Sequence, residues 1–351
     1  GHAMESPPAD QRGVLASHPL AVPAVGVGNL TVGGTGKTPV AAWLAAELRA
    51  RGGRPAIVLR GVGGDEPRVH ALLNPDVPVV VDADRVAGAS EAARLGADLV
   101  VLDDAFQHRR ARRDVDLVLV SAERFDARAV RLLPAGPYRE GLAALRRASA
   151  VIVTRKTATP ERASAAMRAL GAHAPAVAAV HLAADRLRAW DPSAADAAGA
   201  PAERPLASLA GAGVLAIAGI GEPGPFVAEL ERAGARVTPV LLGDHHRFTE
   251  ADAVALARRV AGGGLPICTL KDAVKLGPRW PRGAPPLWYV SQRVAVEHGA
   301  DELDALVGRL LAARPTARAP RDVVAPPVAR SDAHAPARAP ASDTAGPDRR
   351  E

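Results

Sequence analysis

The chain of 351 residues has few lysines, cysteines and aromatic side chains. Of its 44 basic residues only four are lysines, and the others are arginines. A single cysteine, Cys268, excludes a disulfide scaffold and any zinc cluster built on cysteines. The scarcity of aromatic rings disfavours modules that stack nucleic-acid bases. No apolar run reaches the ~18 residues of a spanning helix, and no signal peptide is visible.

The composition otherwise suits a folded protein, because 48% of the residues are hydrophobic, enough for a sizeable core. We expect a soluble intracellular α/β protein of about two domains. Its formal net charge of +6 favours an anionic partner, namely a nucleotide, a phospholipid or a nucleic acid. A general bias toward arginine would explain the same charge without a partner. The opening Gly1-His2-Ala3-Met4 resembles the remnant of a cloning and cleavage site.

Short apolar runs alternate with helical patterns along most of the chain. The predicted strands span residues 24–28, 55–60, 77–82, 98–102, 115–121, 150–154, 213–219, 236–242, 265–269 and 287–291. The predicted helices span residues 40–51, 87–95, 225–233, 250–261 and 301–312. Continuous Val, Leu and Ile runs alternating with helices indicate a parallel sheet covered on both faces.

Shifts in composition predict five segments. These are an irregular N-terminus at 1–20, a phosphate-loop lobe at 21–190, a hinge at 191–212, a smaller α/β lobe at 213–313 and a tail at 314–351. The tail is rich in Pro, Ala and Arg and has too few apolar residues to order itself, so we expect it to be disordered.

A glycine-rich segment, Gly28-Asn29-Leu30-Thr31-Val32-Gly33-Gly34-Thr35-Gly36-Lys37-Thr38, joins a predicted strand to a predicted helix. In that position glycines let backbone N–H groups turn toward phosphate oxygens, and the helix N-terminus adds positive potential. Lys37 would reach the β- and γ-phosphates, and the Thr38 hydroxyl would ligate Mg²⁺. The full phosphate-loop pattern requires glycine where Thr31 stands, so the match is to the Gly-Lys-Thr core.

Another apolar strand ends in Asp103 and Asp104. Beside a phosphate loop, such a strand delivers a carboxylate to the Mg²⁺ ion. We therefore expect Thr38, Asp103 and Asp104 to hold the metal, and the sequence leaves open which aspartate contacts it.

Seven segments in chain order together resemble the tetraacyldisaccharide 4′-kinase family of lipid A biosynthesis. They are Val25–Pro39, Gly64-Asp65-Glu66-Pro67, Asp103-Asp104-Ala105-Phe106-Gln107-His108, Leu133–Glu140, Gly219–Pro223, Asp244-His245-His246 and Leu270–Leu276. The resemblance runs from about residue 22 to about residue 312. It implies an α/β fold, in which a P-loop NTPase-like parallel sheet lobe and a second smaller α/β lobe enclose the active site in the cleft between them.

The resemblance also implies the activity. The family transfers the γ-phosphate of ATP to the 4′-hydroxyl of a tetraacylated glucosamine disaccharide 1-phosphate lipid, giving lipid IVA. We accordingly expect ATP and Mg²⁺ as cofactors and a peripheral location on the cytoplasmic face of the inner membrane. We expect no nucleic acid and no obligate protein partner.

Site residues follow by the same resemblance. Thr31, Val32, Gly33, Gly34, Thr35, Gly36, Lys37 and Thr38 would bind ATP. Asp65 would accept the proton of the sugar hydroxyl. His245 would pair with Asp65 when the lobes close, which would discourage ATP hydrolysis. Contacts to phosphate or acceptor are expected from Asn29, Gln107, His108 and Arg139.

Several of these residues have structural alternatives. Asp65 could be a turn residue, His245 a helix-entry cap, His108 a structural histidine and Arg139 a surface arginine. The cationic run 108–113 could face lipid headgroups or the substrate 1-phosphate, or simply solvent.

The chain departs from the family pattern at three places. The family usually has a hydrophobic helix before the phosphate loop, whereas the given sequence has about twenty residues without a hydrophobic pattern before Pro23; either the sequence was trimmed or this member lacks the helix. The segment 60–65 is short, and Ala105 stands where the family has glycine. Two rival functions remain at this point. One is another phosphate-loop small-molecule kinase or GTPase, and the other is a nucleotide-dependent switch that binds nucleic acid.

Overall fold

The computed structural model describes residues 17–61, 64–190 and 202–315. Most of the predicted N-terminal segment, residues 191–201 of the predicted hinge and nearly all of the predicted tail lie outside these residues, so those predictions stay untested. No helix of the described chain is long and apolar enough to cross a bilayer.

Twelve strands form one sheet in the order β10-β9-β11-β12-β7-β6-β5-β1-β4-β2-β3, with β8 paired to β7. Pairing is parallel throughout, except that β7 is antiparallel to β12 and to β8. The strands are β1 (Ala24–Asn29), β2 (Pro55–Leu59), β3 (Val79–Val81), β4 (Leu99–Asp103), β5 (Val115–Ser121), β6 (Ala150–Arg155), β7 (Val177–Ala189), β8 (Glu203–Pro205), β9 (Gly213–Ala218), β10 (Arg236–Leu241), β11 (Leu265–Thr269) and β12 (Trp288–His298). The predicted α/β class with a mostly parallel sheet is confirmed.

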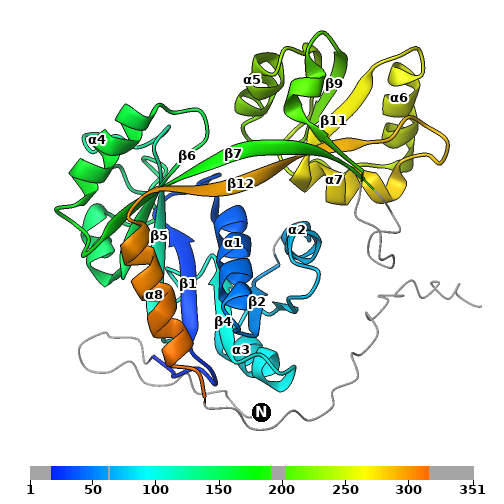
Figure 1. Cartoon of the computed structure of the whole chain (residues 1–351). Coiled ribbons are helices and arrows are strands. Elements are labelled where there is room, and N and C mark those ends of the chain that lie inside the picture. The colour runs from blue at the N-terminus through cyan, green and yellow to red at the C-terminus, as the bar shows by residue number, and fades with distance from the viewer. Residues whose placement is uncertain (1–16, 62–63, 191–201, 316–351) are drawn as a thin grey trace, which may run out of the picture. The chain divides into compact units, whose positions relative to one another are not determined.

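Helices cover both faces of this sheet (Figure 1). They are α1 (Lys37–Ala50), α2 (Glu66–Leu73), α3 (Arg85–Arg94), α4 (Pro160–Leu170), α5 (Gly224–Arg232), α6 (Glu250–Val260), α7 (Leu270–Leu276) and α8 (Ala300–Ala312). Successive strand residues point to opposite faces. Val25 accordingly packs with α1 and α8, whereas its neighbour Ala24 packs with α3. This alternation within continuously buried strands explains why their sequences are apolar without interruption.

The two longest strands, β7 and β12, run antiparallel to each other. They join a first group of strands, β1 to β6, to a second group, β9 to β11 (Figure 1). The sequence patterns predict only residues 287–291 of β12 and nothing of β7. The reason is visible in β7, whose sequence VAAVHLAADRLRA is rich in alanine and arginine. Alanine is depleted in strands and the charged residues interrupt the apolar pattern, so β7 forms through its pairing with β6 and β12.

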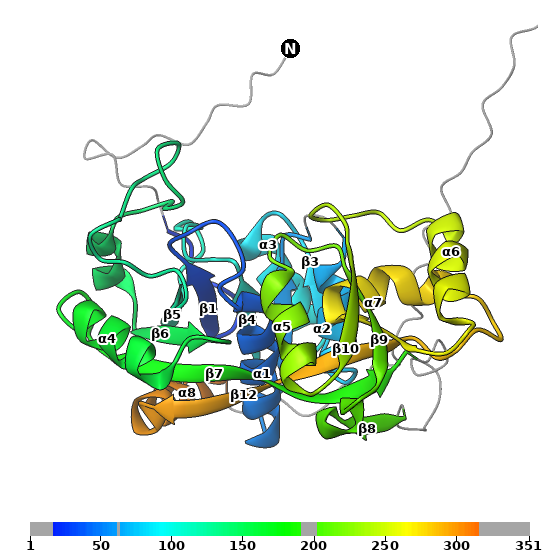
Figure 2. The ribbon, with the colours of Figure 1, turned by 90° about the horizontal axis from the view of Figure 1, so that it is seen from above.

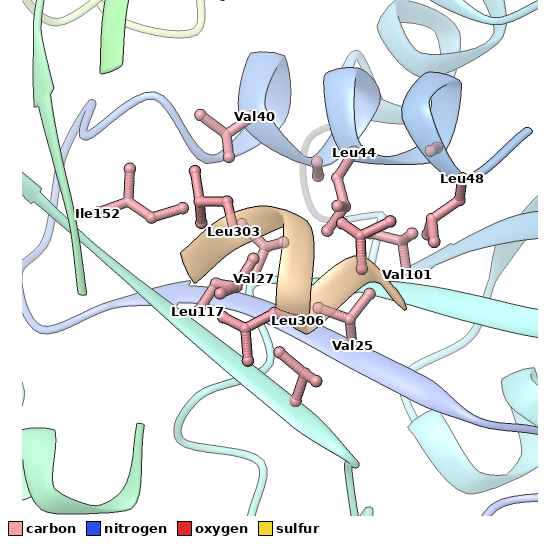
Figure 3. Close-up of a cluster of buried hydrophobic side chains, with 14 of the residues drawn as sticks. Val25, Val27, Val40, Leu44, Leu48, Val101, Leu117, Ile152, Leu303 and Leu306 are labelled. Carbon is pink, nitrogen blue, oxygen red and sulfur yellow. The ribbon is translucent and has the colours of Figure 1, made fainter. Parts of the chain in front are cut away.

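Helix α8 packs against the core of the first group of strands, although the sequence grouped its residues with the second lobe. Leu303 and Leu306 lie in one buried cluster with Val25, Leu44 and Leu117 (Figure 3). The cause is β12, which leads the chain back along β7 before α8 begins.

Replacing Leu306 tests this packing, since the side chain is only 7% exposed. Leu306→Ala should lower the free energy of unfolding by about 2–5 kcal/mol, because it removes apolar contacts and leaves a cavity. Urea unfolding followed by circular dichroism measures the change. The control is Val254→Ala on α6, where the side chain is 38% exposed. Equal effects of the two substitutions would contradict the placement of α8.

Candidate functional site

The loop between β1 and α1 has the backbone that phosphate binding requires. Gly33 and Gly36 have φ angles of 102° and 85°, in the left-handed region that glycine adopts without strain. A Cβ atom at Gly33 would meet the end of the Arg124 side chain, and one at Gly36 would meet a methyl group of Leu182, so either side chain would have to shift. Helix α1 begins directly after Gly36, so its free N–H groups face the loop.

Two side chains brace this loop from within the protein. The buried Asn29 donates from Nδ2 to Thr35 Oγ1 at 3.0 Å. The Thr154 hydroxyl at the end of β6 donates to the carbonyl oxygen of Thr35 at 2.9 Å. Asn29 therefore points into the loop, and its expected contact with phosphate or substrate stays a prediction.

The carboxyl end of β4 lies beside the loop, because β4 pairs with β1 in parallel. Asp103 is buried, and its Oδ2 lies 2.9 Å from Nε2 of the buried His70 on α2. The other oxygen, Oδ1, is buried without a hydrogen-bond partner. Buried polar atoms are nearly always paired, so an unpaired carboxylate oxygen is suited to a bound cation.

These groups fit a magnesium ion that binds together with nucleotide phosphates. Mg²⁺ usually takes one or two carboxylates from the protein and completes its shell with phosphate oxygens and water. Asp103 offers the unpaired oxygen, and Thr38 is buried on the first turn of α1. Nowhere in residues 17–61, 64–190 or 202–315 do three His, Cys, Asp or Glu side chains form a metal cluster of their own.

Asp104 has a different environment from Asp103. Its φ of 52° is unusual for a residue other than glycine. Lys37 Nζ lies 3.6 Å from Asp104 Oδ1, and Arg139 Nη1 donates to the same oxygen at 3.1 Å. The left-handed turn thus falls on Asp104 and not on Ala105, so the alanine at 105 carries no backbone strain.

Gln107 connects the segment after β4 to the start of the phosphate loop after β1. Its Nε2 donates to the Asn29 carbonyl oxygen at 2.9 Å and to Glu140 Oε1 at 3.2 Å, and its Oε1 accepts from Arg139 Nη1 at 3.4 Å. The structure therefore brings Asn29, Gln107 and Arg139 together. His108 follows at the edge of this network, and burial together with the charge of Arg85 lowers its pKa.

Asp65 is the N-cap of helix α2, and Glu66 is the first residue of that helix. Asp65 is buried, and its Oδ1 has no hydrogen-bond partner. Burial raises the pKa of Glu66, an effect that the nearby charge of Lys271 opposes and that of Asp103 reinforces. Lys271 Nζ, on α7, lies 3.5 Å from Glu66 Oε1. The site thus includes a residue from the second group of strands and helices.

His245 does not reach Asp65 in this structure. Its side chain is 63% exposed, and no hydrogen bond or ion pair joins these two described residues. Its backbone has a φ of 57°, and its N–H donates to Asp244 Oδ1 at 3.0 Å. The expected pairing of Asp65 with His245 stays a prediction.

His70, Glu66 and Arg85 were not predicted from the sequence as site residues. Arg85 is buried and donates from Nη2 to the Asp103 carbonyl oxygen at 3.3 Å. Helix α2 was not predicted, so the one-turn spacing of Glu66 and His70 carried no weight. That spacing is the signal that could have found them, whereas nothing in the sequence distinguishes Arg85 from the other arginines.

Glu123 holds the segment after β6 in place. Its Oε1 accepts from the backbone N–H groups of Lys156 at 2.5 Å, Thr157 at 3.0 Å and Ala158 at 3.1 Å. Burial disfavours the charged form, but hydrogen bonds from Lys156, Ser121 and Ala158 outweigh it and lower the pKa of Glu123 to about 2.

Comparison with known proteins gives a consistent result. Residues 8–311 match the family model described as Tetraacyldisaccharide-1-P 4'-kinase. A protein of Anaeromyxobacter sp. (strain Fw109-5) named Tetraacyldisaccharide 4'-kinase is 38% identical over 328 residues, covering 85% of this chain and 86% of that protein. A protein of the same name from Geobacter metallireducens is 38% identical over 294 residues, covering 76% and 82%. The solved structure of LpxK from Aquifex aeolicus in complex with ATP has a TM-score of 0.65 at 28% identity, covering 86% of this chain and 92% of that one.

The low pKa of Glu123 leads to a pH-dependent prediction. Because the folded state lowers this pKa, the stabilisation is present above the unfolded value near 4.5 and is lost as the pH falls toward about 2. Glu123→Gln should therefore lower the unfolding temperature at pH 7 and have a smaller effect at pH 3. Thermal unfolding at both pH values measures this, with the exposed Glu250→Gln as control. A difference that is the same at both values would contradict it.

Proposed function

Because this chain belongs to the tetraacyldisaccharide-1-P 4'-kinase family, we propose that it transfers the γ-phosphate of ATP to the 4′-hydroxyl of a tetraacylated glucosamine disaccharide 1-phosphate. The observation that carries the proposal is the family match over most of the chain, combined with a phosphate loop that lies beside Asp103 and Asp104. The rival functions, a GTPase or a nucleic-acid-binding switch, lack comparable support.

In this proposal the loop from Thr31 to Thr38 binds ATP through its backbone N–H groups, and Lys37 contacts the terminal phosphates. Thr38, Asp103 and Asp104 would hold a Mg²⁺ ion, which would neutralise part of the phosphate charge when bound. Arg139 already contacts Asp104 and is placed to bind a phosphate oxygen in addition.

We assign Asp65 as the group that accepts the proton of the sugar hydroxyl. Support comes from its burial and its unpaired oxygen. Support also comes from its position next to Glu66, whose pKa is raised by the charge of Asp103 and lowered by that of Lys37. We assign His245 as the partner of Asp65 in the substrate-bound state. The strained backbone at His245 supports this role, because such strain is common at functional positions.

Asp65→Asn separates binding from transfer. The variant should keep ATP affinity and lose about 10²- to 10⁴-fold in transfer rate, the usual contribution of a general base. Lys37→Ala should instead weaken ATP binding. Titration calorimetry with ATP and a [γ-³²P]ATP lipid-labelling assay measure the two effects, with the exposed Asp301→Asn as control. Full transfer activity in Asp65→Asn would exclude the proposed base.

We further propose that the protein contacts the membrane peripherally through residues 126–137, which we call the apolar loop. Leu132 and Leu133 are 51% and 53% exposed, and Val32 of the phosphate loop is 40% exposed beside them. The Val32 N–H donates to the Pro137 carbonyl oxygen at 2.9 Å. The segment stands away from the strands between β5 and β6 (Figure 2).

This combination suits an anionic lipid surface. Exposed leucines gain free energy by entering the acyl region, and the exposed Arg128 and Arg131 attract anionic headgroups. A lipid acceptor would then meet the phosphate loop at the membrane surface.

The double substitution Leu132→Ser and Leu133→Ser tests the apolar loop. We expect a smaller fraction of protein to sediment with vesicles that contain phosphatidylglycerol, while ATP affinity stays unchanged. The control is Leu241→Ser, because Leu241 is 55% exposed on β10, far from this loop in the sheet order. Equal sedimentation of the double variant and the unsubstituted protein would exclude the loop as the contact.

A further inference from the structure

The four lysines of this arginine-rich chain are not scattered over the surface. Lys37 ends the phosphate loop, and Lys271 lies 3.5 Å from Glu66 beside it. Lys275 pairs with the buried Asp272 at 3.0 Å. The remaining one, Lys156, comes from the chain after β6, and its Nζ lies 3.4 Å from the carbonyl oxygen of Gly34 in the phosphate loop.

The backbone of Lys156 is fixed at the edge of the sheet where a nucleotide is expected. Lys156 directly follows β6, which lies two strands from β1 on the side opposite β4. Ligands of parallel α/β sheets bind outside the carboxyl ends of the strands. The Glu123 carboxylate holds the Lys156 N–H, and Thr154 two residues earlier holds the Thr35 carbonyl. The side chain therefore extends from a rigid support onto the flank of the loop.

The ammonium group of Lys156 lacks a matching anion in this structure. No carboxylate among the described residues lies within ion-pair distance of its Nζ. Burial lowers its pKa, and the neighbouring cations Lys271 and Arg124 lower it further, while Glu123 and Glu229 partly oppose them. The Nζ group is exposed where it meets the Gly34 carbonyl, so a phosphate that enters this place can gain a charge-assisted hydrogen bond from it.

We propose that Lys156 contacts the nucleotide bound on the phosphate loop, as a second lysine that approaches from the β6 side while Lys37 approaches from α1. The inference rests on the proposed ATP-dependent function and adds a residue to the nucleotide site. A lysine suits this position because its ammonium is compact and makes three hydrogen bonds in adjustable directions, whereas the planar guanidinium of arginine is larger.

Lysine labelling of the unsubstituted protein tests the proposal, and the presence of only four lysines makes the result simple to assign. The protein is acetylated briefly with acetic anhydride, with and without Mg²⁺ and a non-hydrolysable ATP analogue, and each lysine is quantified by peptide mass spectrometry. At ten times the Kd about one tenth of the protein stays free, so acetylation of Lys156 and Lys37 should slow about tenfold. Lys275, paired with Asp272, should react at an unchanged rate.

The outcomes separate this inference from the proposed function. Protection of Lys37 with no protection of Lys156 overturns the inference and leaves the nucleotide site intact. Protection of neither lysine contradicts ATP binding itself. A parallel sample with inorganic tripolyphosphate locates the contact. Protection of Lys156 there as well assigns it to the phosphates, and protection by the nucleotide alone assigns it to the nucleoside.

A substitution provides the second measurement. Lys156→Gln should raise the Kd for ATP about 10- to 100-fold, the loss expected for one hydrogen bond from a charged group. The matched control is Arg155→Gln, the preceding residue on β6, whose guanidinium is paired with Glu297. Thermal unfolding verifies that both variants are folded. An ATP affinity of Lys156→Gln within twofold of the unsubstituted protein would overturn the proposal.

Discussion

The parallel pairing of β1 with β4 is the constraint on which the site depends. Its register sets Val27 opposite Asp103, so the glycine-rich loop after β1 and the two aspartates after β4 leave the sheet side by side. The fit is close, because a Cβ atom at Gly28 would lie only 2.5 Å from Cβ of Phe106. Glycine at position 28 thus lets the two loops touch, and Gln107 then joins them through the Asn29 carbonyl.

Cations and carboxylates from many elements meet near the phosphate loop; most of them follow the parallel strands β2, β4 and β6, and Lys271 comes from beyond the antiparallel pair of β7 and β12. Lys37 comes from α1, Lys156 follows β6 and Lys271 comes from α7, while Asp65 opens α2 and Asp103 ends β4. Buried Asp103 is held by His70, and Glu66 is held by Lys271. Asp65 Oδ1 and Asp103 Oδ1 are buried without a hydrogen-bond partner. We propose proton transfer at Asp65 and cation binding at Asp103.

Much of this edge could be predicted from the sequence. The strands at residues 115–121 and 265–269 have the predicted bounds, since buried parallel strands are marked by a high content of β-branched and aliphatic residues. The strand before Asp103 was recognisable for the same reason, and the phosphate loop was recognisable from its glycines and its Gly-Lys-Thr core. The alanine- and arginine-rich β7 and the short α2 were not, because their formation depends on tertiary contacts. The contact of His70 with Asp103 was missed along with α2.

We propose that this edge of the sheet transfers phosphate from ATP to a lipid disaccharide. The most direct measurement incubates the protein with Mg²⁺, a tetraacylated disaccharide 1-phosphate and either [γ-³²P]ATP or [α-³²P]ATP, and separates the lipids by thin-layer chromatography. The account predicts a labelled lipid with the γ-label alone, in an amount equal to the ADP formed. Binding of ATP without any labelled lipid would contradict it.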